Sequence, residues 1–197
     1  KEYNAYAADA ILRVLLQFAE TSDIHRTYMS EFIKQSSFSE IYQQRMYKVF
    51  RGRINHKHIG NVIRNAGLLK MRLSEQFLLK WFEVALTHRD KKRLKKMPEM
   101  FERYRALPSF QHQQLANTMR GFGELNIRPP GYFMEQWFEA FVREERFHQG
   151  NSLADCVWGL AVLKITPPFD FVESWCQAFE IQCQKPLYRA RIDRYSL

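Results

Sequence analysis

An internal repeat constrains the fold of this chain more than any other feature. Residues 115–141 and 153–179 align without a gap at a spacing of 38, as LANTMRGFGELNIRPPGYFMEQWFEAF and LADCVWGLAVLKITPPFDFVESWCQAF. Twelve of the 27 aligned pairs are identical, and they include a Pro-Pro pair, a tryptophan and a closing Ala-Phe. A unit of this length, repeated along a chain, is the signature of an array built from one supersecondary structure.

Two earlier copies precede these two. Residues 59–85 read IGNVIRNAGLLKMRLSEQFLLKWFEVA and match the copy from Leu115 at nine positions with an offset of 56, so about 18 residues are inserted between them. A more degenerate copy is expected near Ile11, where LLQFAE resembles RGFGE of the third copy. We therefore predict one domain over 1–197, with repeats at 11–36, 59–86, 115–142 and 153–180, a basic insertion at 88–108 and a tail at 185–197.

Each copy has the pattern of two helices. In its first half, small residues recur seven apart, which is close to two helical turns, so they share a face and allow a neighbouring helix to approach. These residues are Gly60 and Gly67, Ala116 and Gly123, and Ala154 and Ala161. In its second half, large aromatic residues such as Phe133, Trp137 and Phe141 follow the spacing of a core-facing stripe. We expect the aligned Trp81, Trp137 and Trp175 to be buried between helices.

The break between the two helices is predicted from proline. The pairs Pro129-Pro130 and Pro167-Pro168 predict the end of one helix and the start of the next, because proline is tolerated in a first turn and not in a helix interior. In the earlier copy Leu73-Ser74 takes their place, and Ser74 can cap the second helix. One pair cannot bury both of its apolar faces, whereas stacked pairs can. The predicted fold is therefore all-α, an α-solenoid of stacked helix-turn-helix repeats of about 38 residues.

Two further structural predictions concern a helix outside the aligned copies and the cysteines. The segment 37–50 is predicted to form a helix, with four apolar residues facing the core: Phe38, Ile41, Met46 and Phe50. The three cysteines are odd in number and lack CxxC spacing, so we expect buried helix residues and neither disulfides nor metal ligands. They are Cys156, Cys176 and Cys183.

The charge of the chain favours a polyanionic partner. It has 30 Lys and Arg against 21 Asp and Glu, a net charge of +9. Nucleic acid is the first expectation and an acidic membrane surface the second, and the alternative is a basic but otherwise ordinary domain. No apolar run approaches the length of a membrane span, so no membrane-spanning segment is expected. Of the two polyanions we expect nucleic acid as the partner, and no membrane.

Candidate phosphate contacts come from the densest cationic stretches, at 89–96 and in the tail. They are Arg89, Lys91, Lys92, Arg93, Lys95, Lys96, Arg189, Arg191 and Arg194. The alternative for such a charge run is a solvated face.

Candidate base contacts occupy equivalent polar positions, three residues apart, in the predicted first helices. They are Asn61 and Arg64, Asn117 and Arg120, and Asp155 and Trp158. Amide and guanidinium groups can hydrogen-bond base edges, and an indole can stack on a base. The alternative is a polar stripe that faces solvent.

No pattern of catalysis is found. The stretch Gly121-Phe122-Gly123 lacks a following Lys-Ser/Thr and lies within a predicted helix, so it does not indicate a phosphate-binding loop. His56 and His58 alone do not make a metal site. We therefore expect no enzymatic activity, no catalytic residue, no cofactor, no metal site and no small-molecule substrate.

The two best copies resemble a known repeat family. The stretches LANTMRGFGELNIRPP at 115–130 and LADCVWGLAVLKITPP at 153–168 resemble the octotricopeptide repeat, with its Leu-Ala-x-x-x-Trp-Ala-x-Ala-x-Leu core followed by Pro. The related heptatricopeptide repeats occur in RAP-domain proteins and in Fas-activated serine/threonine kinase-like proteins. The resemblance covers about 59–179 and has departures: Arg120 stands where Trp158 matches the family, and Leu73-Ser74 replaces the prolines.

The resemblance implies RNA binding in mitochondria or chloroplasts, in transcript processing, translation or ribosome assembly. The expected partners are RNA, including ribosomal RNA, and neighbouring proteins of a ribonucleoprotein complex. Mitochondrial localisation is expected first, with the chloroplast as the alternative. Two other function classes stay open: a protein-protein interaction scaffold of a mitochondrial complex without RNA contact, and an enzyme whose catalytic domain is not in this chain.

Overall fold

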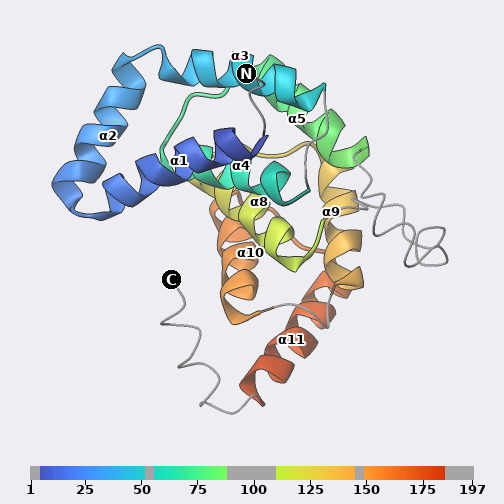
Figure 1. Ribbon diagram of the computed structural model, residues 1–197. Coiled ribbons are helices and arrows are strands. Elements are labelled where there is room, and N and C mark those ends of the chain that lie inside the picture. Colours follow the sequence, from blue (N-terminus) through green and yellow to red (C-terminus); the bar gives the residue numbers. More distant parts are fainter. Residues whose placement is uncertain (1–4, 52–55, 88–109, 145–148, 185–197) are drawn as a thin grey trace.

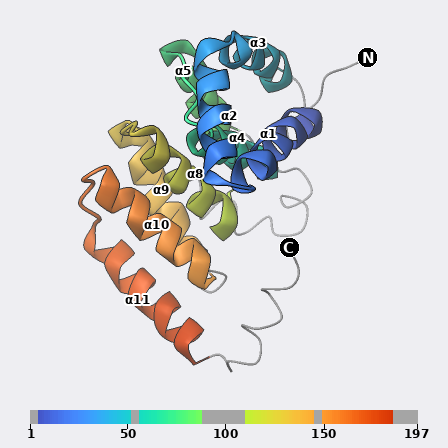
Figure 2. The same cartoon turned by 90° about the vertical axis from the view of Figure 1, so that its left-hand side faces the viewer.

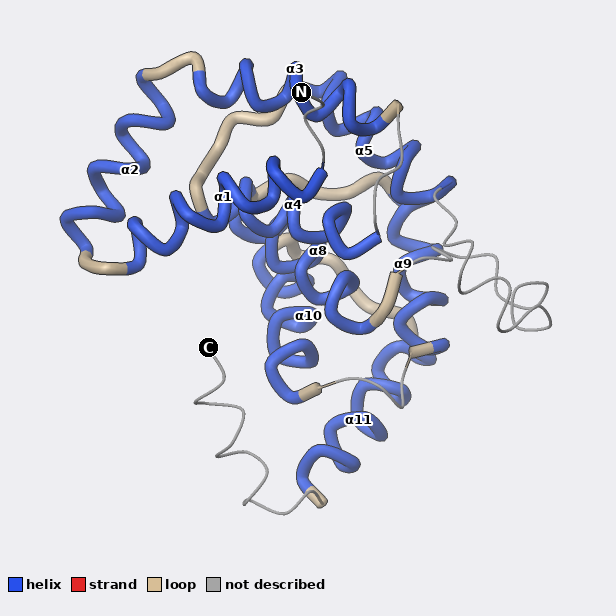
Figure 3. Tube along the Cα trace, in the orientation of Figure 1, coloured by secondary structure: helices blue, strands red, loops and turns tan. Residues whose placement is uncertain are grey.

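The described part of the protein is entirely helical. The computed structural model describes residues 5–51, 56–87, 110–144 and 149–184, and these contain helices and their connections but no strand (Figures 1 and 3). The helices are α1 (Ala5–Glu20), α2 (Asp23–Gln35), α3 (Phe38–Phe50), α4 (His56–Leu68), α5 (Glu75–Thr87), α8 (His112–Leu125), α9 (Gly131–Arg143), α10 (Gly150–Val162) and α11 (Phe169–Cys183). The predicted all-α class is confirmed.

Three helix pairs coincide with the three aligned copies. The pairs are α4 with α5, α8 with α9, and α10 with α11. Each first helix begins three residues before the first aligned residue of its copy, for example at His112 for the copy from Leu115. The prediction of helix pairs over 59–85, 115–141 and 153–179 is confirmed.

The first helices end on a left-handed residue, and not on proline. Lys70, Asn126 and Lys164 are aligned in the repeat and have φ of 52°, 54° and 52°. The N–H of Lys164 donates to the carbonyl of Ala161, and the N–H of Ile165 donates to the carbonyl of Leu160. The other two copies have the same pair of bonds. This is the Schellman pattern that satisfies terminal carbonyls. The predicted role of the prolines in stopping the first helix was wrong.

The prolines and Ser74 instead start the second helices. Pro130 and Pro168 are the N-cap residues of α9 and α11. In α5 the Phe77 N–H donates to Oγ of Ser74 at 3.2 Å, so the predicted cap is confirmed. Proline suits this place because the first N–H groups of a helix have no acceptor within it.

The first helices lie side by side. α4 packs along α8, and α8 along α10, while α5, α9 and α11 follow one another on the other side (Figures 1 and 2). A Cβ built on Gly121 would lie 2.5 Å from the backbone of Ile63, and one on Gly159 would lie 2.5 Å from the carbonyl oxygen of Met119. These helices therefore meet backbone to backbone, at positions where a side chain does not fit.

The predicted small-residue face is confirmed where a neighbouring helix covers it. A Cβ on Gly67 would lie 2.6 Å from the carbonyl oxygen of Gly121, and one on Gly123 would lie 2.6 Å from the Trp158 ring. Ala154 and Ala161 of α10 are exposed. No further described helix packs on that side of α10, so the equivalent face is left uncovered.

The aligned tryptophans make the same hydrogen bond in each pair. Nε1 of Trp81 donates to the carbonyl of Ile59 at 3.0 Å, and Trp137 and Trp175 bond the first aligned residue of their own copies at 3.2 Å. Trp81 and Trp137 are fully buried, whereas Trp175 is partly buried. The predicted burial is complete for two tryptophans and partial for the one in the last pair.

Apolar positions that the repeat aligns are less completely buried in the last pair. Val157 is 39% exposed and Phe179 is 49% exposed, although their counterparts Met119 and Phe141 are fully buried. Two cysteines of α11 are exposed and only Cys156 is buried, so the cysteine prediction holds for one of three. The physical reason is the same in each case: a periodic pattern marks an apolar face, but a neighbouring pair must be present to bury it.

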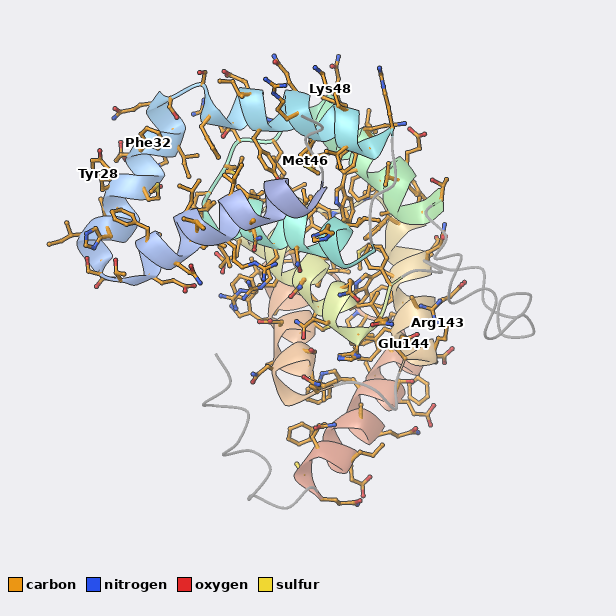
Figure 4. All side chains as sticks on the ribbon, viewed as in Figure 1. Tyr28, Phe32, Met46, Lys48, Arg143 and Glu144 are labelled. Atoms are coloured by element: carbon orange, nitrogen blue, oxygen red, sulfur yellow. The ribbon has the colours of Figure 1, made fainter. Side chains whose placement is uncertain are left out.

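The N-terminal helices follow a different geometry from the three pairs. A two-residue connection joins α1 to α2, because Ser22 caps α2 at once by accepting from the His25 N–H at 3.2 Å. In α3 the inward face is Tyr42, Met46, Val49 and Phe50, and the predicted Ile41 is 53% exposed. Figure 4 shows Met46 and Lys48 on opposite sides of this helix.

Buried apolar side chains nevertheless form one cluster. It extends from Leu12 in α1 to Ala178 in α11. Ring contacts carry it along the second helices, with centroid distances of 5.0 Å between Phe82 and Phe133 and 4.4 Å between Phe141 and Phe171. The core thus lies between the row of first helices and the row of second helices, and it fixes the spacing of the polar face described next.

Candidate functional site

The six candidate base-contact residues lie together on the first helices. Because α4, α8 and α10 lie side by side, equivalent positions of successive copies become neighbours. The set comprises Asn61 and Arg64 on α4, Asn117 and Arg120 on α8, and Asp155 and Trp158 on α10. We call this set, with its immediate partners, the polar face.

Amide side chains connect the three helices of the polar face. Asn117 Nδ2 donates to Oδ1 of Asn61 at 2.7 Å, and Gln113 Nε2 donates to Oδ1 of Asn117 at 3.0 Å. Ser152 Oγ lies 3.5 Å from Oε1 of Gln113 and extends the chain of contacts to α10. Asn117 is only 5% exposed. Its amide therefore serves helix packing, and an incoming base would have to displace a buried hydrogen bond.

Charged side chains form the second part of the polar face. The guanidinium of Arg120 lies 3.9 Å from the ring centroid of Trp158, a cation-π contact. The same guanidinium lies 2.7 Å from Glu124 and 3.5 Å from Asp155. Lys70 Nζ lies 2.6 Å from the Glu124 carboxylate. One face of the Trp158 indole is thus occupied by Arg120, so a base would have to stack on the other face or replace the guanidinium.

The two carboxyl groups of this cluster respond differently to their surroundings. Burial alone would raise the pKa of Glu124, but the hydrogen bond and charge of Lys70, together with Arg120, hold it below its ordinary value. Burial raises the pKa of Asp155, and the charges of Arg120 and Arg64 offset this only in part. With both acids ionised, three cations face two carboxylates. The polar face is therefore close to electrically balanced.

The candidate phosphate contacts lie outside the described residues. This holds for all of those proposed at 89–96 and at 189–194. The described ranges hold 15 of the 30 Lys and Arg and 15 of the 21 Asp and Glu, so the described helices are net neutral. The +9 charge belongs entirely to the segments between and after them.

Charge is also unevenly distributed along the described helices. Residues 5–51 and 56–87 carry 11 cations and 7 acids, whereas 110–144 and 149–184 carry 4 cations and 8 acids. The N-terminal half of the described structure is thus basic and the C-terminal half acidic. An acidic partner therefore suits the N-terminal half, and a basic partner suits the C-terminal half.

The sequence did not predict a groove between α9 and α11. Its volume is about 880 Å³. Phe138, Val142 and Phe171 are among its apolar lining residues, and acidic groups are contributed by Glu139 and Asp170. In the sequence, the apolar stripe of the second helices predicts only a face that packs in the core. It assigns no function to the acidic residues on the opposite face of α9 and α11.

Arg143 at the end of α9 also lines this groove. Its Nε lies 3.1 Å from Oε1 of Glu144, and its guanidinium donates to the carbonyl of Phe110 at 2.8 Å. Both side chains of the Arg143–Glu144 pair, labelled in Figure 4, are almost fully buried. This pair therefore fixes the connection that leads into α8 and is not available to a partner.

Two other kinds of site are absent from the described ranges. No group of three or more His, Cys, Asp or Glu there is placed to hold a metal ion. In the same ranges, no helix has the length and apolar character needed to cross a membrane.

Comparison of this chain with protein families, with curated proteins and with solved structures finds no match. What the protein does is therefore inferred from its repeat, its charge and the contacts of its helices.

Proposed function

We propose that this chain is an organellar RNA-binding helical-repeat protein. Its place is the mitochondrion, with the chloroplast as the alternative, and it acts in mitochondrial ribosome structure or assembly or in organellar RNA metabolism. Its helix pairs stack as an α-solenoid of about 38 residues per repeat. Its partners are RNA, including ribosomal RNA, and neighbouring proteins of a ribonucleoprotein complex.

One observation carries the proposal. Equivalent polar residues of three successive copies form a continuous strip across α4, α8 and α10, from Asn61 to Trp158. A strip with the same two positions in each repeat suits a linear polymer with a repeating unit. The flanking segments, which carry the whole net charge of +9, supply the cations that a phosphate backbone requires.

The test neutralises the cationic run and follows RNA binding against salt. Replacing Lys91, Lys92, Arg93 and Lys95 by Gln should weaken binding to single-stranded RNA of any sequence. For every phosphate interaction that these substitutions remove, the slope of log affinity against log salt should fall by about 0.7. The measurement is fluorescence anisotropy of a labelled oligonucleotide at several salt concentrations.

A matched control removes four other exposed cations, which lie on the described helices and turns. They are Arg45, Lys48, Arg128 and Lys164. The two variants have the same net charge, so a general loss of attraction would affect them equally. If the 89–96 variant binds as the parent does, with the same slope, the run is a solvated segment and the protein-protein scaffold becomes the better-supported function.

A protein-protein scaffold without RNA contact is the second candidate. It is favoured by uncovered apolar side chains at both ends of the array, such as Ile24, Tyr28 and Phe32 on α2 and Phe169 and Phe179 on α11. Tyr28 and Phe32 are labelled on α2 in Figure 4. Patches of this kind mark contact surfaces. Nucleic-acid content of the complex isolated from the organelle distinguishes the two candidates.

A further inference from the structure

A polar cavity of about 260 Å³ lies where α2 ends, α3 begins and the turn from α4 to α5 passes. Three hydroxyl groups and three cationic groups are among its lining side chains. They belong to Ser36, Ser39 and Ser74, and to Lys34, Lys70 and Arg72. None of these residues belongs to the polar face except Lys70, which contacts Glu124.

The hydroxyl of Ser39 is buried without a partner. Ser39 is 8% exposed, and its Oγ has no hydrogen-bond partner among the described residues. Buried hydroxyl groups are normally hydrogen-bonded, and an unused one in a native protein calls for a physical explanation. Ser39 lines the cavity, but its Oγ has almost no accessible surface, so a change of the side-chain rotamer is needed to turn the hydroxyl toward a ligand bound there. Such a ligand would then supply the missing partner.

Gln43 holds the wall of the cavity in place. Its Nε2 donates to the carbonyls of Ser39 and Arg72, both at 3.0 Å, and its Oε1 accepts from the Ser74 N–H at 2.7 Å. The Ser74 hydroxyl also donates to this oxygen. Gln43 and Ser74 are thus occupied by the fold, whereas Ser39 is not. The cavity is preorganised by bonds that a ligand need not disturb.

The charge of the lining favours an anion. Lys34, Lys70 and Arg72 line it together with one acid, the exposed Glu40. Lys34 also contacts Glu31 at 3.6 Å and Lys70 contacts Glu124 at 2.6 Å, so Arg72 is the lining cation that forms no ion pair with the described residues. Ser39 and Glu40 lie in the first turn of α3, where backbone N–H groups lack acceptors within the helix and the dipole is positive. The N-cap residue Ser37 makes no capping bond with its side chain, and the Ser36 hydroxyl accepts from the Phe38 N–H at 3.3 Å. The cavity also lies in the basic half of the described structure.

We propose that this cavity binds a phosphate group. At about 260 Å³ it is smaller than the 300–1,000 Å³ of sites for drug-sized ligands, but larger than the roughly 30 Å³ of one water molecule. A phosphate with the sugar atoms next to it is of this scale. The Arg72 guanidinium donates to its oxygens, and the Ser39 hydroxyl does so once its side chain has changed rotamer. The phosphate belongs either to an RNA backbone, which rests on the proposed function, or to a free phosphate ester, which does not.

The first test is a titration of the full chain with inorganic phosphate at constant ionic strength, followed by calorimetry. Arg72→Gln should weaken phosphate binding roughly tenfold, since a charged hydrogen bond is lost. Arg128→Gln is the matched control, because Arg128 occupies the aligned position of the next copy, is exposed and lies outside the cavity. Absence of saturable binding, or equal effects of the two variants, would overturn the proposal.

Ser39→Ala separates a binding role from a structural one. Without phosphate the variant should be at least as stable as the parent, since an unpartnered buried hydroxyl is removed. With phosphate it should bind several-fold more weakly. A variant that is less stable without phosphate and binds phosphate normally would show that Ser39 serves the fold alone.

A second titration with single-stranded oligouridylate identifies the source of the phosphate. If Arg72→Gln weakens binding of this RNA more than Arg128→Gln does, the ligand is a backbone phosphodiester. If only inorganic phosphate binding falls, the ligand is a free phosphate ester and the cavity stands. If the parent binds inorganic phosphate but no RNA, the proposed function fails while the cavity is upheld.

Discussion

The contact between α4 and α8 should be intolerant of a single methyl group at Gly121. Its Cβ would lie 2.5 Å from the Ile63 carbonyl group, whereas ordinary contact begins at 3.4 Å, so the helices must separate by about 0.9 Å. The obstructing atoms are backbone and cannot turn aside. Overpacking of this kind costs about 1–3 kcal/mol or more, and alanine's better helix propensity returns about 1 kcal/mol. Because the clash is with backbone, the cost lies at the upper end of this range, and we expect Gly121→Ala to lower the free energy of unfolding by about 2 kcal/mol net.

The assay is urea unfolding followed by circular dichroism, with the midpoint and the m-value measured separately. Gly131→Ala is the matched control, because a Cβ at Gly131, the first residue of α9, meets no atom within 4 Å. That variant should be neutral or slightly more stable. If Gly121→Ala were as stable as Gly131→Ala, α4 and α8 would not approach as described, and the inferred row of first helices would be wrong.

Two further predictions follow from burial and charge. Trp137→Ala should lower the free energy of unfolding by about 3–5 kcal/mol, and Trp175→Ala by clearly less, because only Trp137 is fully buried; equal losses in urea unfolding would contradict this. The folded pKa of Glu124 is lowered, so its contribution to stability is present above the unfolded pKa of about 4.3 and is lost as pH falls through the folded value. Below pH 5 the free energy of unfolding of the parent should therefore fall more steeply with decreasing pH than that of Glu124→Gln. If unfolding measured at several acidic pH values gave parallel curves for the two proteins, the ion pair between Lys70 and Glu124 would not stabilise the fold.

The distribution of charge changes what a net charge of +9 means for this protein. If RNA binds mainly through phosphate contacts, the neutral set of helices supplies a scaffold, and the segments at 88–109 and 185–197 supply most of the attraction. The cavity beside Ser39 would then be a separate, localised contact for one phosphate. The salt dependence of RNA binding and the phosphate titration report on these two contributions independently.

Part of the candidate site was predictable from sequence, and part was not. Alignment of the copies placed Asn61, Asn117 and Asp155 at equivalent positions, and the structure brings them to one face. The alignment did not reveal that Asn117 is bonded to Asn61, or that Arg120 already lies on the Trp158 ring. Those contacts depend on the distance between adjacent helices, which the close approach at glycine sets.

The phosphate cavity was not visible in the sequence at all. Its residues come from the end of α2, the start of α3 and the turn before α5, and the bond from Ser74 to Gln43 spans 31 residues. No short motif connects them. Only the packing of α3 against α5 and its connection brings Ser39 and Arg72 to the same cavity.

The sequence by itself determined the helix pairs, their start points and the inward tryptophans, because these follow from local periodicity and capping chemistry that the three aligned copies share. Tertiary structure alone decided which faces are covered. Met119 is buried and its counterpart Val157 is exposed, although both lie at the same position of the repeat. A local pattern states only that a face is apolar. Burial requires a second surface at contact distance, and the described helices include none that covers α10 as α10 covers α8.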